Sequence, residues 1–267
     1  MAETNLNTND REPWMRIITG WPRDLAVAGA FLTRLPFRPA APVGMVDLSP
    51  AARTFPLIGL LVGGIAGGAL WLGARVDLHP LACAFIGLAV GAWISGALHE
   101  DGLADFVDGL GGRDREHRLE IMRDSRIGSY GVLALIFSVG LKAALLAGFM
   151  GPGRAAGALI AAAVISRAVV PLVMARLAPA RRDGLGQGVG EVNMVTALTA
   201  LGFGLFGGVA LLGPGVGLLA LGMALCTALA VGRLARKRLG GYTGDVLGAV
   251  QQTAEVAVLI AAGAYAI

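Results

Sequence analysis

Charged residues are scarce in this chain: aspartate, glutamate, lysine and arginine make up 15% of its 267 residues, and the mean hydropathy is +0.69. Soluble domains carry about 25% charged residues, so the composition argues against that class and indicates an integral membrane protein.

Cysteine is also scarce, with two residues in the chain. Because Cys83 and Cys226 both lie in apolar segments, a disulfide framework or a thiolate metal site has no support. The polar residues 1–20 lack the basic start and apolar core of a secretory signal, and we interpret them as a flexible tail.

What the chain has in abundance is long apolar runs. A bilayer core about 30 Å thick needs roughly 20 apolar residues per helix. We therefore predict an all-α, polytopic transmembrane helix bundle that forms one integral membrane domain over residues 1–267. About seven spans are expected, with six or eight as alternatives, because only "GPG" separates the fifth from the sixth. A shorter stretch, "DLAVAGAFLTRLPF", is expected to lie at the interface or to re-enter the membrane. The predicted spans cover residues 54–74, 80–98, 131–150, 155–177, 194–212, 215–232 and 246–266.

With seven spans, the basic residues sort by side. One face holds 18 of the 22 lysine and arginine residues, in the N-terminal region, at one span end and in the loops 99–130, 178–193 and 233–245. The other face holds only Arg75 and Arg154. Because loops rich in lysine and arginine stay in the cytoplasm, we expect the first face to be cytoplasmic. The expected location is a bacterial inner membrane, with the active site facing the cytoplasm and the C-terminus on the outer side.

Four carboxylates stand close together in "LHEDGLADFVDGLGG", directly after the second predicted span. On a helix, Asp101, Asp105 and Asp108 fall within about 60° of arc, so three like charges share one stripe. Stacked anions repel each other, and no lysine or arginine lies between Arg75 and Arg113 to compensate them. We therefore predict that these aspartates are ligands of a divalent cation, Mg²⁺ or Mn²⁺. A solvated acidic helix end is the alternative.

Loops that combine arginine and glycine follow on the same face. In "RDSRIGSYG", Arg123, Arg126 and Ser129 stand beside glycines, and guanidinium groups with exposed backbone N–H groups suit a phosphate. A second loop, "ARRDGLGQGVG", contains Arg182; an ordinary positive-inside anchor explains it equally well. The third, "GGYTGDVLGA", places Asp245 at the start of the last span, either as a site residue or as a plain helix-start acid after a capping threonine.

Three ionisable residues fall within predicted spans, where a charge is costly unless it faces the bundle interior. Arg167 and Glu255 either pair or line a polar cavity, whereas Lys142 either faces the interior or snorkels to the interface. A metal ion held by an acidic helix, together with arginines in glycine-rich loops, suits the binding of a pyrophosphate. No G-x-S-x-G or Cys–His arrangement indicates a hydrolase with a covalent nucleophile, so we expect a transferase whose catalytic region is the loop 99–130.

These motifs resemble the cobalamin synthase family, the polytopic adenosylcobinamide-GDP ribazoletransferases that close the nucleotide loop of vitamin B12. The resemblance covers most of the chain, through "FLTRLPF", "FPLIGLLVG", "HEDGLADFVDGLGG", "IMRDSRIGSYGV" and "GGYTGDVLGA" followed by Glu255. It implies a Mg²⁺-dependent transfer in which the ribose 3′-hydroxyl of α-ribazole, or of its 5′-phosphate, attacks adenosylcobinamide-GDP and GMP leaves. The implied product is adenosylcobalamin or its 5′-phosphate.

The resemblance also implies a role for each candidate residue by its motif position. Asp101, Asp105 and Asp108 would hold the metal, one of them also serving as base, while Asp124 and Asp245 would be further ligands or orienting groups. The expected partners are small-molecule substrates and the lipid bilayer, without nucleic acid, and a homo-oligomer is left open. The substrate-binding residues are expected to be Arg123, Arg126, Ser129, Arg182, Arg167 and Glu255.

Two other functions compete with this one. The acidic motif is also similar to that of the CDP-alcohol phosphotransferases, membrane enzymes that move a phosphoalcohol and release CMP. However, Asp105 stands where their signature has an arginine, and Gly109 directly follows the third aspartate. A membrane transporter with Arg167 and Glu255 along its substrate path is the second alternative. Such proteins often show repeats in matching halves, and we find no convincing internal repeat.

Overall fold

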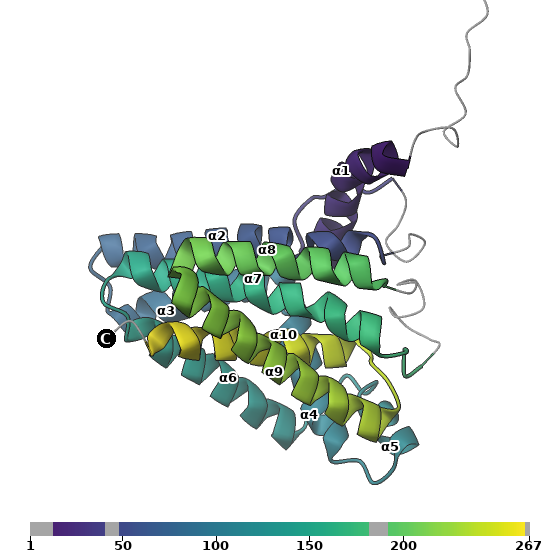
Figure 1. The fold of residues 1–267 in the computed structure, drawn as a ribbon. Helices are drawn as coiled ribbons and strands as arrows, with labels where there is room; N and C mark the ends of the chain where they lie inside the picture. The colour runs from purple at the N-terminus through teal and green to yellow at the C-terminus, as the bar shows by residue number, and fades with distance from the viewer. Residues whose placement is uncertain (1–12, 41–47, 182–191, 265–267) are drawn as a thin grey trace, which may run out of the picture.

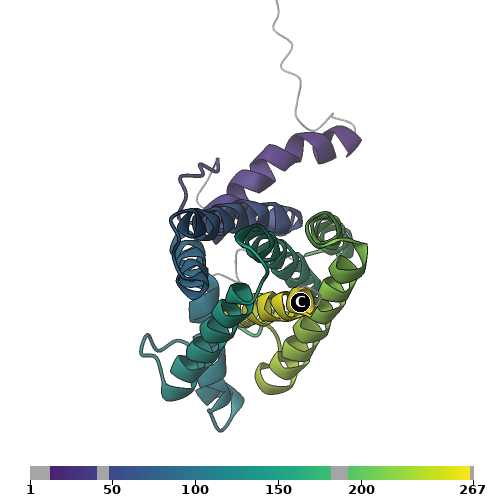
Figure 2. The ribbon, with the colours of Figure 1, turned by 90° about the vertical axis from the view of Figure 1, so that its left-hand side faces the viewer.

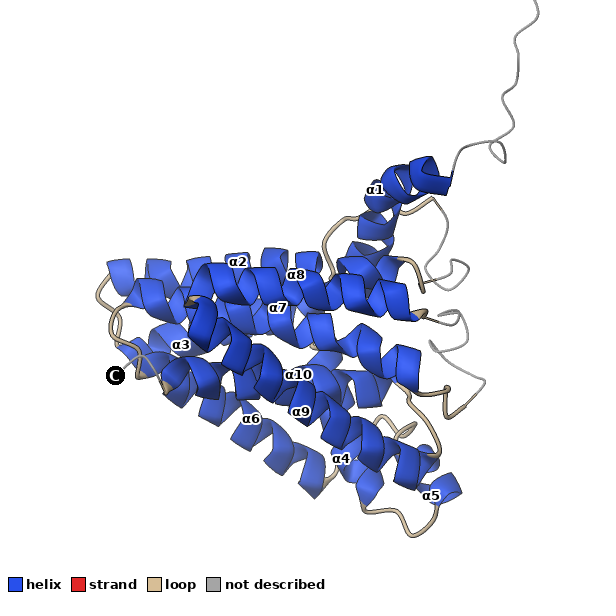
Figure 3. Ribbon diagram, in the orientation of Figure 1, coloured by secondary structure: helices blue, strands red, loops and turns tan. Residues whose placement is uncertain are grey.

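The computed structural model describes residues 13–40, 48–181 and 192–264. The described residues are mostly helical and contain no strand, only an isolated bridge between Pro179 and Tyr242 (Figure 3). The prediction of an all-α fold is therefore confirmed. The elements are α1 (Pro13–Leu32), η3 (Ala51–Thr54), α2 (Phe55–Arg75), α3 (Pro80–Ser95), α4 (Leu98–Leu110), α5 (Arg115–Ile121), α6 (Ser129–Ala147), α7 (Pro152–Arg176), α8 (Met194–Leu212), α9 (Pro214–Leu239) and α10 (Gly244–Gly263).

The long apolar helices lie side by side as a polytopic bundle (Figure 1). Within the described ranges, six helices are long and apolar enough to cross a membrane, and α3 with α4 forms a bent pair that raises the number to seven. This agrees with the expected count of about seven spans. The fifth and sixth predicted spans form a tight hairpin, since α8 ends at Leu212 and α9 begins at Pro214.

Helices α7 and α10 are the most buried of the candidate spans and lie among the others when the bundle is viewed from its end (Figure 2). Their buried faces are rich in alanine and valine; Ala161, Ala162, Ala168 and Val169 of α7 have no exposed surface. Small side chains let helix backbones approach closely, which is how transmembrane helices gain packing energy in lipid. These two helices therefore form the centre against which the site is built.

A sharp bend separates α3 from α4. Gly96 and Ala97 both have positive φ, 66° and 55°, a left-handed conformation that is easy for glycine and costly for alanine. The bend turns α4 by 89° relative to α3, so the predicted span 80–98 ends early, at Ser95. Helix α4 lies at the end of the bundle where α6 and α10 begin (Figure 1). We call this end the basic end, because Arg115, Arg176 and Arg236 are found there.

Helix α1 leaves the bundle at the basic end (Figures 1 and 2). It is not among the candidate spans, and the interfacial or re-entrant position expected for the segment 24–37 stays a prediction. Its Asp24 forms an ion pair with Arg53 of η3 at 2.7 Å, and the Arg53 guanidinium also lies over the Trp21 ring. The predicted tail of residues 1–20 lies outside the described residues as far as position 12, and the remainder is the first part of α1.

Candidate functional site

Helix α4 packs on α10 through two glycines. A methyl group added to Gly102 would lie 3.0 Å from the Asp245 Cα atom, and one added to Gly248 would lie 3.0 Å from the His99 carbonyl oxygen. The two backbones therefore touch without side chains between them, a contact typical of membrane helices. It brings the aspartate stripe of α4 beside Asp245, two segments more than a hundred residues apart in the sequence.

Gly248→Leu is expected to push α4 away from α10 and to lower the stability of the protein by about 1–3 kcal/mol, the usual cost of overpacking. Thermal unfolding of the purified protein in detergent measures this. Gly222→Leu is the matched control, since a methyl group at Gly222 of α9 meets nothing within 4 Å. Equal unfolding temperatures for the two variants would show that the α4–α10 contact is not close.

Asp105 lies in the middle of the acidic cluster and is half-buried. Burial raises the pKa of its carboxyl group to about 7, and the charges of Asp101, Asp245 and Asp108 act in the same direction, against Arg181. A raised pKa of this kind means that the protein does not itself neutralise the negative charge it has gathered. The cluster is thus electrostatically suited to a cation.

The protein alone does not complete a metal site. Over the part of the chain that the structure describes, no three aspartate, glutamate, histidine or cysteine side chains are placed together as ligands of one ion. Mg²⁺ does not need such a cage, because it usually binds one or two carboxylates and fills its octahedral shell with water and substrate phosphates. The hard oxygen donors of Asp101 and Asp105 fit that mode of binding, and a soft thiolate site is absent from this cluster.

Asp108 links the end of α4 to the beginning of α6. Its Oδ2 accepts a hydrogen bond from the Gly128 N–H at 2.7 Å, and its Oδ1 accepts one from the Gly131 N–H at 2.9 Å. A carboxylate at a helix N-terminus satisfies free backbone donors and interacts favourably with the helix dipole. The sequence pattern did not indicate this capping role, which uses both oxygens of a predicted metal ligand. The assignment of Asp108 to the metal stays a prediction.

Asp245 is held from two directions at the start of α10. The segment after α7 pairs with Tyr242 through two backbone hydrogen bonds of 2.7 and 3.0 Å, which places Arg181 Nη2 3.7 Å from Asp245 Oδ2. The Thr243 hydroxyl donates to Asp245 at 3.1 Å and caps α10, as expected from the sequence. Asp245 also lies close enough to the α4 aspartates for its charge to act on Asp105, and its role as a site residue stays a prediction. Arg182, expected to bind a phosphate, lies outside the described residues.

The loop before α6 carries the other predicted phosphate ligands at the surface. The Arg126 guanidinium donates to both oxygens of Asp124, with 2.6 Å between Nη2 and Oδ2, and this pairing lowers the pKa of Asp124 to about 2. Arg123 and Ser129 are also exposed here, Ser129 as the first residue of α6. Asp124 and Arg126 thus bind each other, and because exposed ion pairs are weak, a phosphate can replace the carboxylate at small cost.

A second polar cluster is buried inside the bundle next to α4. The Lys142 ammonium donates to Glu255 Oε2 at 2.9 Å and to Gln252 Oε1 at 2.8 Å, and Gln252 Nε2 donates to Glu100 Oε1 at 3.0 Å. Lys142 is 2% exposed, so it faces the interior and does not snorkel. Because Glu100 directly precedes Asp101, this chain of hydrogen bonds fastens the beginning of α4 to the core.

Arg167 approaches the same cluster from α7. Together with Glu100 and Glu255 it lines a cavity of about 30 Å³, which has room for about one water molecule. In the described part of the chain, Glu100 Oε2 and Arg167 Nε are buried and have no hydrogen-bond partner, so a water that bridges them would remove a substantial cost. The expectation that Arg167 and Glu255 line a polar cavity is confirmed. The cavity has no room for a nucleotide. Glu255 is linked to α4 through Lys142, Gln252 and Glu100, whereas Arg167 donates to the Ala163 carbonyl oxygen of its own helix.

Comparisons with known proteins identify the family of the chain. The family model for cobalamin-5-phosphate synthase matches residues 24–263. An adenosylcobinamide-GDP ribazoletransferase from Bradyrhizobium diazoefficiens is 44% identical over 91% of this chain and 94% of its own length. Proteins with the same name from Azorhizobium caulinodans and Sinorhizobium medicae are 42% and 44% identical and cover 91% and 88% of this chain, and 96% and 94% of their own lengths. No solved structure matches the chain. The chain belongs to the cobalamin-5-phosphate synthase family.

Proposed function

We propose that this protein joins adenosylcobinamide-GDP to α-ribazole or α-ribazole 5′-phosphate and releases GMP, forming adenosylcobalamin or its 5′-phosphate. Near full-length identity to relatives named for this transfer supports the substrate pair. The observation that carries the chemistry is the meeting of Asp101 and Asp105 with Asp245 at the α4–α10 contact. Oxygen donors gathered on one surface, with arginines nearby, suit a reaction at a pyrophosphate.

In this proposal Asp101 and Asp105 hold Mg²⁺, with Asp108 next to them at the end of α4. When bound, Mg²⁺ would offset the negative charge of the pyrophosphate oxygens. The ribose 3′-oxygen forms a bond to the phosphorus that carries the corrinoid side chain, and the bond from that phosphorus to the GMP oxygen breaks. We assign the proton of the attacking hydroxyl to Asp245, which lies across from the metal ligands and is oriented by Thr243.

The arginines supply the remaining contacts to phosphate. Arg181 lies beside Asp245, and Arg126 and Arg123 stand on the loop that ends at α6. Guanidinium groups bind phosphate oxygens in pairs of hydrogen bonds, which fixes orientation as well as charge. The basic end then faces the cytoplasm of a bacterial inner membrane, as the distribution of lysine and arginine favours. In that orientation the C-terminus is on the outer side.

Release of GMP tests the proposal directly. The purified protein is incubated with Mg²⁺, adenosylcobinamide-GDP and either α-ribazole or α-ribazole 5′-phosphate, and GMP is quantified by chromatography. GMP is expected only when corrinoid, ribazole and Mg²⁺ are all present. No GMP above a metal-free control would overturn the proposal. A parallel reaction with a CDP-alcohol tests the phosphotransferase alternative, for which CMP would appear instead.

A further inference from the structure

A cavity of about 180 Å³ lies between α7 and α9 at the basic end, apart from the aspartate site. Helices α8 and α9 are joined at the opposite end and spread apart toward the basic end, with α7 between them (Figure 1). The cavity opens where they diverge. Its walls are apolar, formed mainly by Leu172 and Val173 of α7 and by Leu229 of α9. A hydrocarbon chain would fit such walls, whereas water in the cavity would find few hydrogen-bond partners there.

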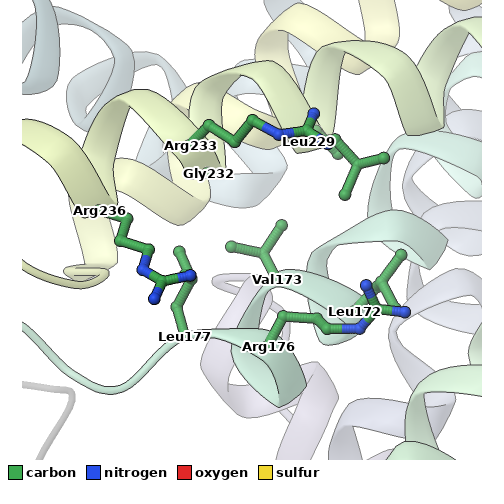
Figure 4. A pocket seen from close by; sticks show the side chains of 9 residues that line it. Leu172, Val173, Arg176, Leu177, Leu229, Gly232, Arg233 and Arg236 are labelled. Atoms are coloured by element: carbon green, nitrogen blue, oxygen red, sulfur yellow. The ribbon is translucent and has the colours of Figure 1, made fainter.

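Three arginines stand around this cavity. Arg176 comes from the last turn of α7, and Arg233 and Arg236 come from the last two turns of α9, three residues apart and so on one face of the helix. In Figure 4 the guanidinium of Arg233 lies near Leu229, that of Arg176 near Leu172 and that of Arg236 near Leu177, at three places around the apolar lining. None of the described residues that line the cavity is acidic. Within the described part of the chain, the cavity therefore combines apolar walls with three arginines and no carboxylate.

The position of the cavity in the membrane decides which ligand can fill the cavity. The arginines stand at the ends of the apolar helices α7 and α9, so we expect them at the level of lipid head groups, with the cavity extending from them toward the hydrocarbon. Basic pockets between transmembrane helices bind anionic head groups, and arginine binds phosphate oxygens in a forked geometry. A free phosphate would fit the rim but leave the apolar walls uncovered. A zwitterionic lipid would bring an ammonium group to a rim where no described side chain is a carboxylate.

We propose that the α7–α9 cavity is a binding site for one anionic phospholipid, whose phosphate lies among Arg176, Arg233 and Arg236 and part of whose acyl chain occupies the apolar interior. This lipid site does not include the residues that we assign to the transfer reaction, so the two proposals are tested independently.

Native mass spectrometry of the full-length protein in detergent, titrated with phosphatidylglycerol, tests the proposal. One tightly bound lipid per chain is expected, and R233Q/R236Q is expected to bind it about 30-fold more weakly, as two lost lysine-or-arginine contacts near a surface predict. K237Q/R238Q is the matched control, because it removes the same charge from the same helix outside the cavity. It should change the affinity less than about threefold, since its contacts are not part of the site.

A second variant tests the apolar half without changing charge. A methyl group at Gly232 would contact Leu177 and Val173 at ordinary distances of 3.7 to 4.0 Å, so Gly232→Leu should fill the cavity and displace the lipid while the protein stays folded. Phosphatidylcholine should bind at least about tenfold more weakly than phosphatidylglycerol, and inorganic phosphate should not displace the lipid. Equal weakening by both double variants, equal binding of the two lipids, displacement by phosphate, or lipid retained in Gly232→Leu would each overturn the proposal.

Discussion

Asp105→Asn is expected to lower the rate of GMP formation by about 10²–10³-fold, while the protein stays folded. Asparagine keeps the shape of the side chain but removes the charge that we assign to Mg²⁺, at the centre of the acidic cluster. The rate is measured under saturating substrates with the variant purified as the wild type. Asp77→Asn, an exposed aspartate between α2 and α3, is the matched control and should turn over normally. A near-normal rate for Asp105→Asn would remove Asp105 from the catalytic site.

The same variant is expected to be more stable than the wild type at pH 8. In the folded protein the pKa of Asp105 is about 7, above the value of about 3.9 for an unfolded chain, so above pH 7 the fold carries a charge that it disfavours. This unfavourable contribution is complete above pH 7, shrinks as the pH falls toward 4, and is absent below it. Asp105→Asn should therefore raise the unfolding temperature at pH 8 by roughly 2–4 °C and hardly at all at pH 4.5.

Added Mg²⁺ distinguishes an electrostatic cause of the higher unfolding temperature of Asp105→Asn from a structural cause. If Asp105 binds the metal, added Mg²⁺ stabilises the wild type through mass action and removes most of the advantage of Asp105→Asn at pH 8. Differential scanning fluorimetry with and without Mg²⁺ gives both quantities. An advantage that is the same at both pH values, or that Mg²⁺ leaves unchanged, would contradict the electrostatic account.

Lys142→Met is expected to destabilise the protein by about 3–5 kcal/mol, the usual cost of removing one partner from a buried ion pair. The substitution leaves the carboxylates of Glu255 and Glu100 with Arg167 as the remaining cation of the cluster. Lys142→Met/Glu255→Gln should recover much of the loss, because it removes the stranded charge as well. Unfolding in detergent is measured for the wild type, both single variants and the double variant.

Lys237 provides a matched control for this cycle, since it is the second of the two lysines in the chain and is exposed at the end of α9. Lys237→Met should be close to neutral. A Lys142→Met variant as stable as Lys237→Met would mean that Lys142 reaches the interface and not Glu255. Loss of GMP formation in Lys142→Met at temperatures where it is still folded is also expected, because Gln252 then holds Glu100 and α4 less firmly.

Much of the fold follows from local patterns. Runs of about 20 apolar residues predict the membrane helices, and the charge stripe of Asp101, Asp105 and Asp108 predicts one acidic helix face. The bend at Gly96 could not be predicted from hydropathy, because the apolar run continues to residue 98. The bend depends on backbone φ angles, which a hydropathy pattern does not report. The GPG ambiguity was resolved by the helix boundaries on either side of Gly213.

The parts of the site that depend on distant contacts were not predictable from one sequence. Asp245 was recognised as a candidate, but its position beside α4 depends on the contact between Gly102 and Gly248, and glycines occur throughout this chain. The link from Gln252 to Glu100 joins two helices far apart in the sequence, and each residue alone fits many roles. The spacing of Asp108 places it on the aspartate stripe, while its hydrogen-bond partners Gly128 and Gly131 lie just before and within α6.

Helix α4 is fixed at both ends, by Glu100 to the buried cluster and by Asp108 to the start of α6. A short helix supported in this way resists tilting, because any tilt breaks hydrogen bonds at one support. The orientation of its carboxylates is therefore set when the chain folds and does not have to be created in each reaction cycle. Groups that need no rearrangement at the moment of bond exchange lower the activation barrier most effectively, so in the proposed reaction a rigid α4 would favour catalysis.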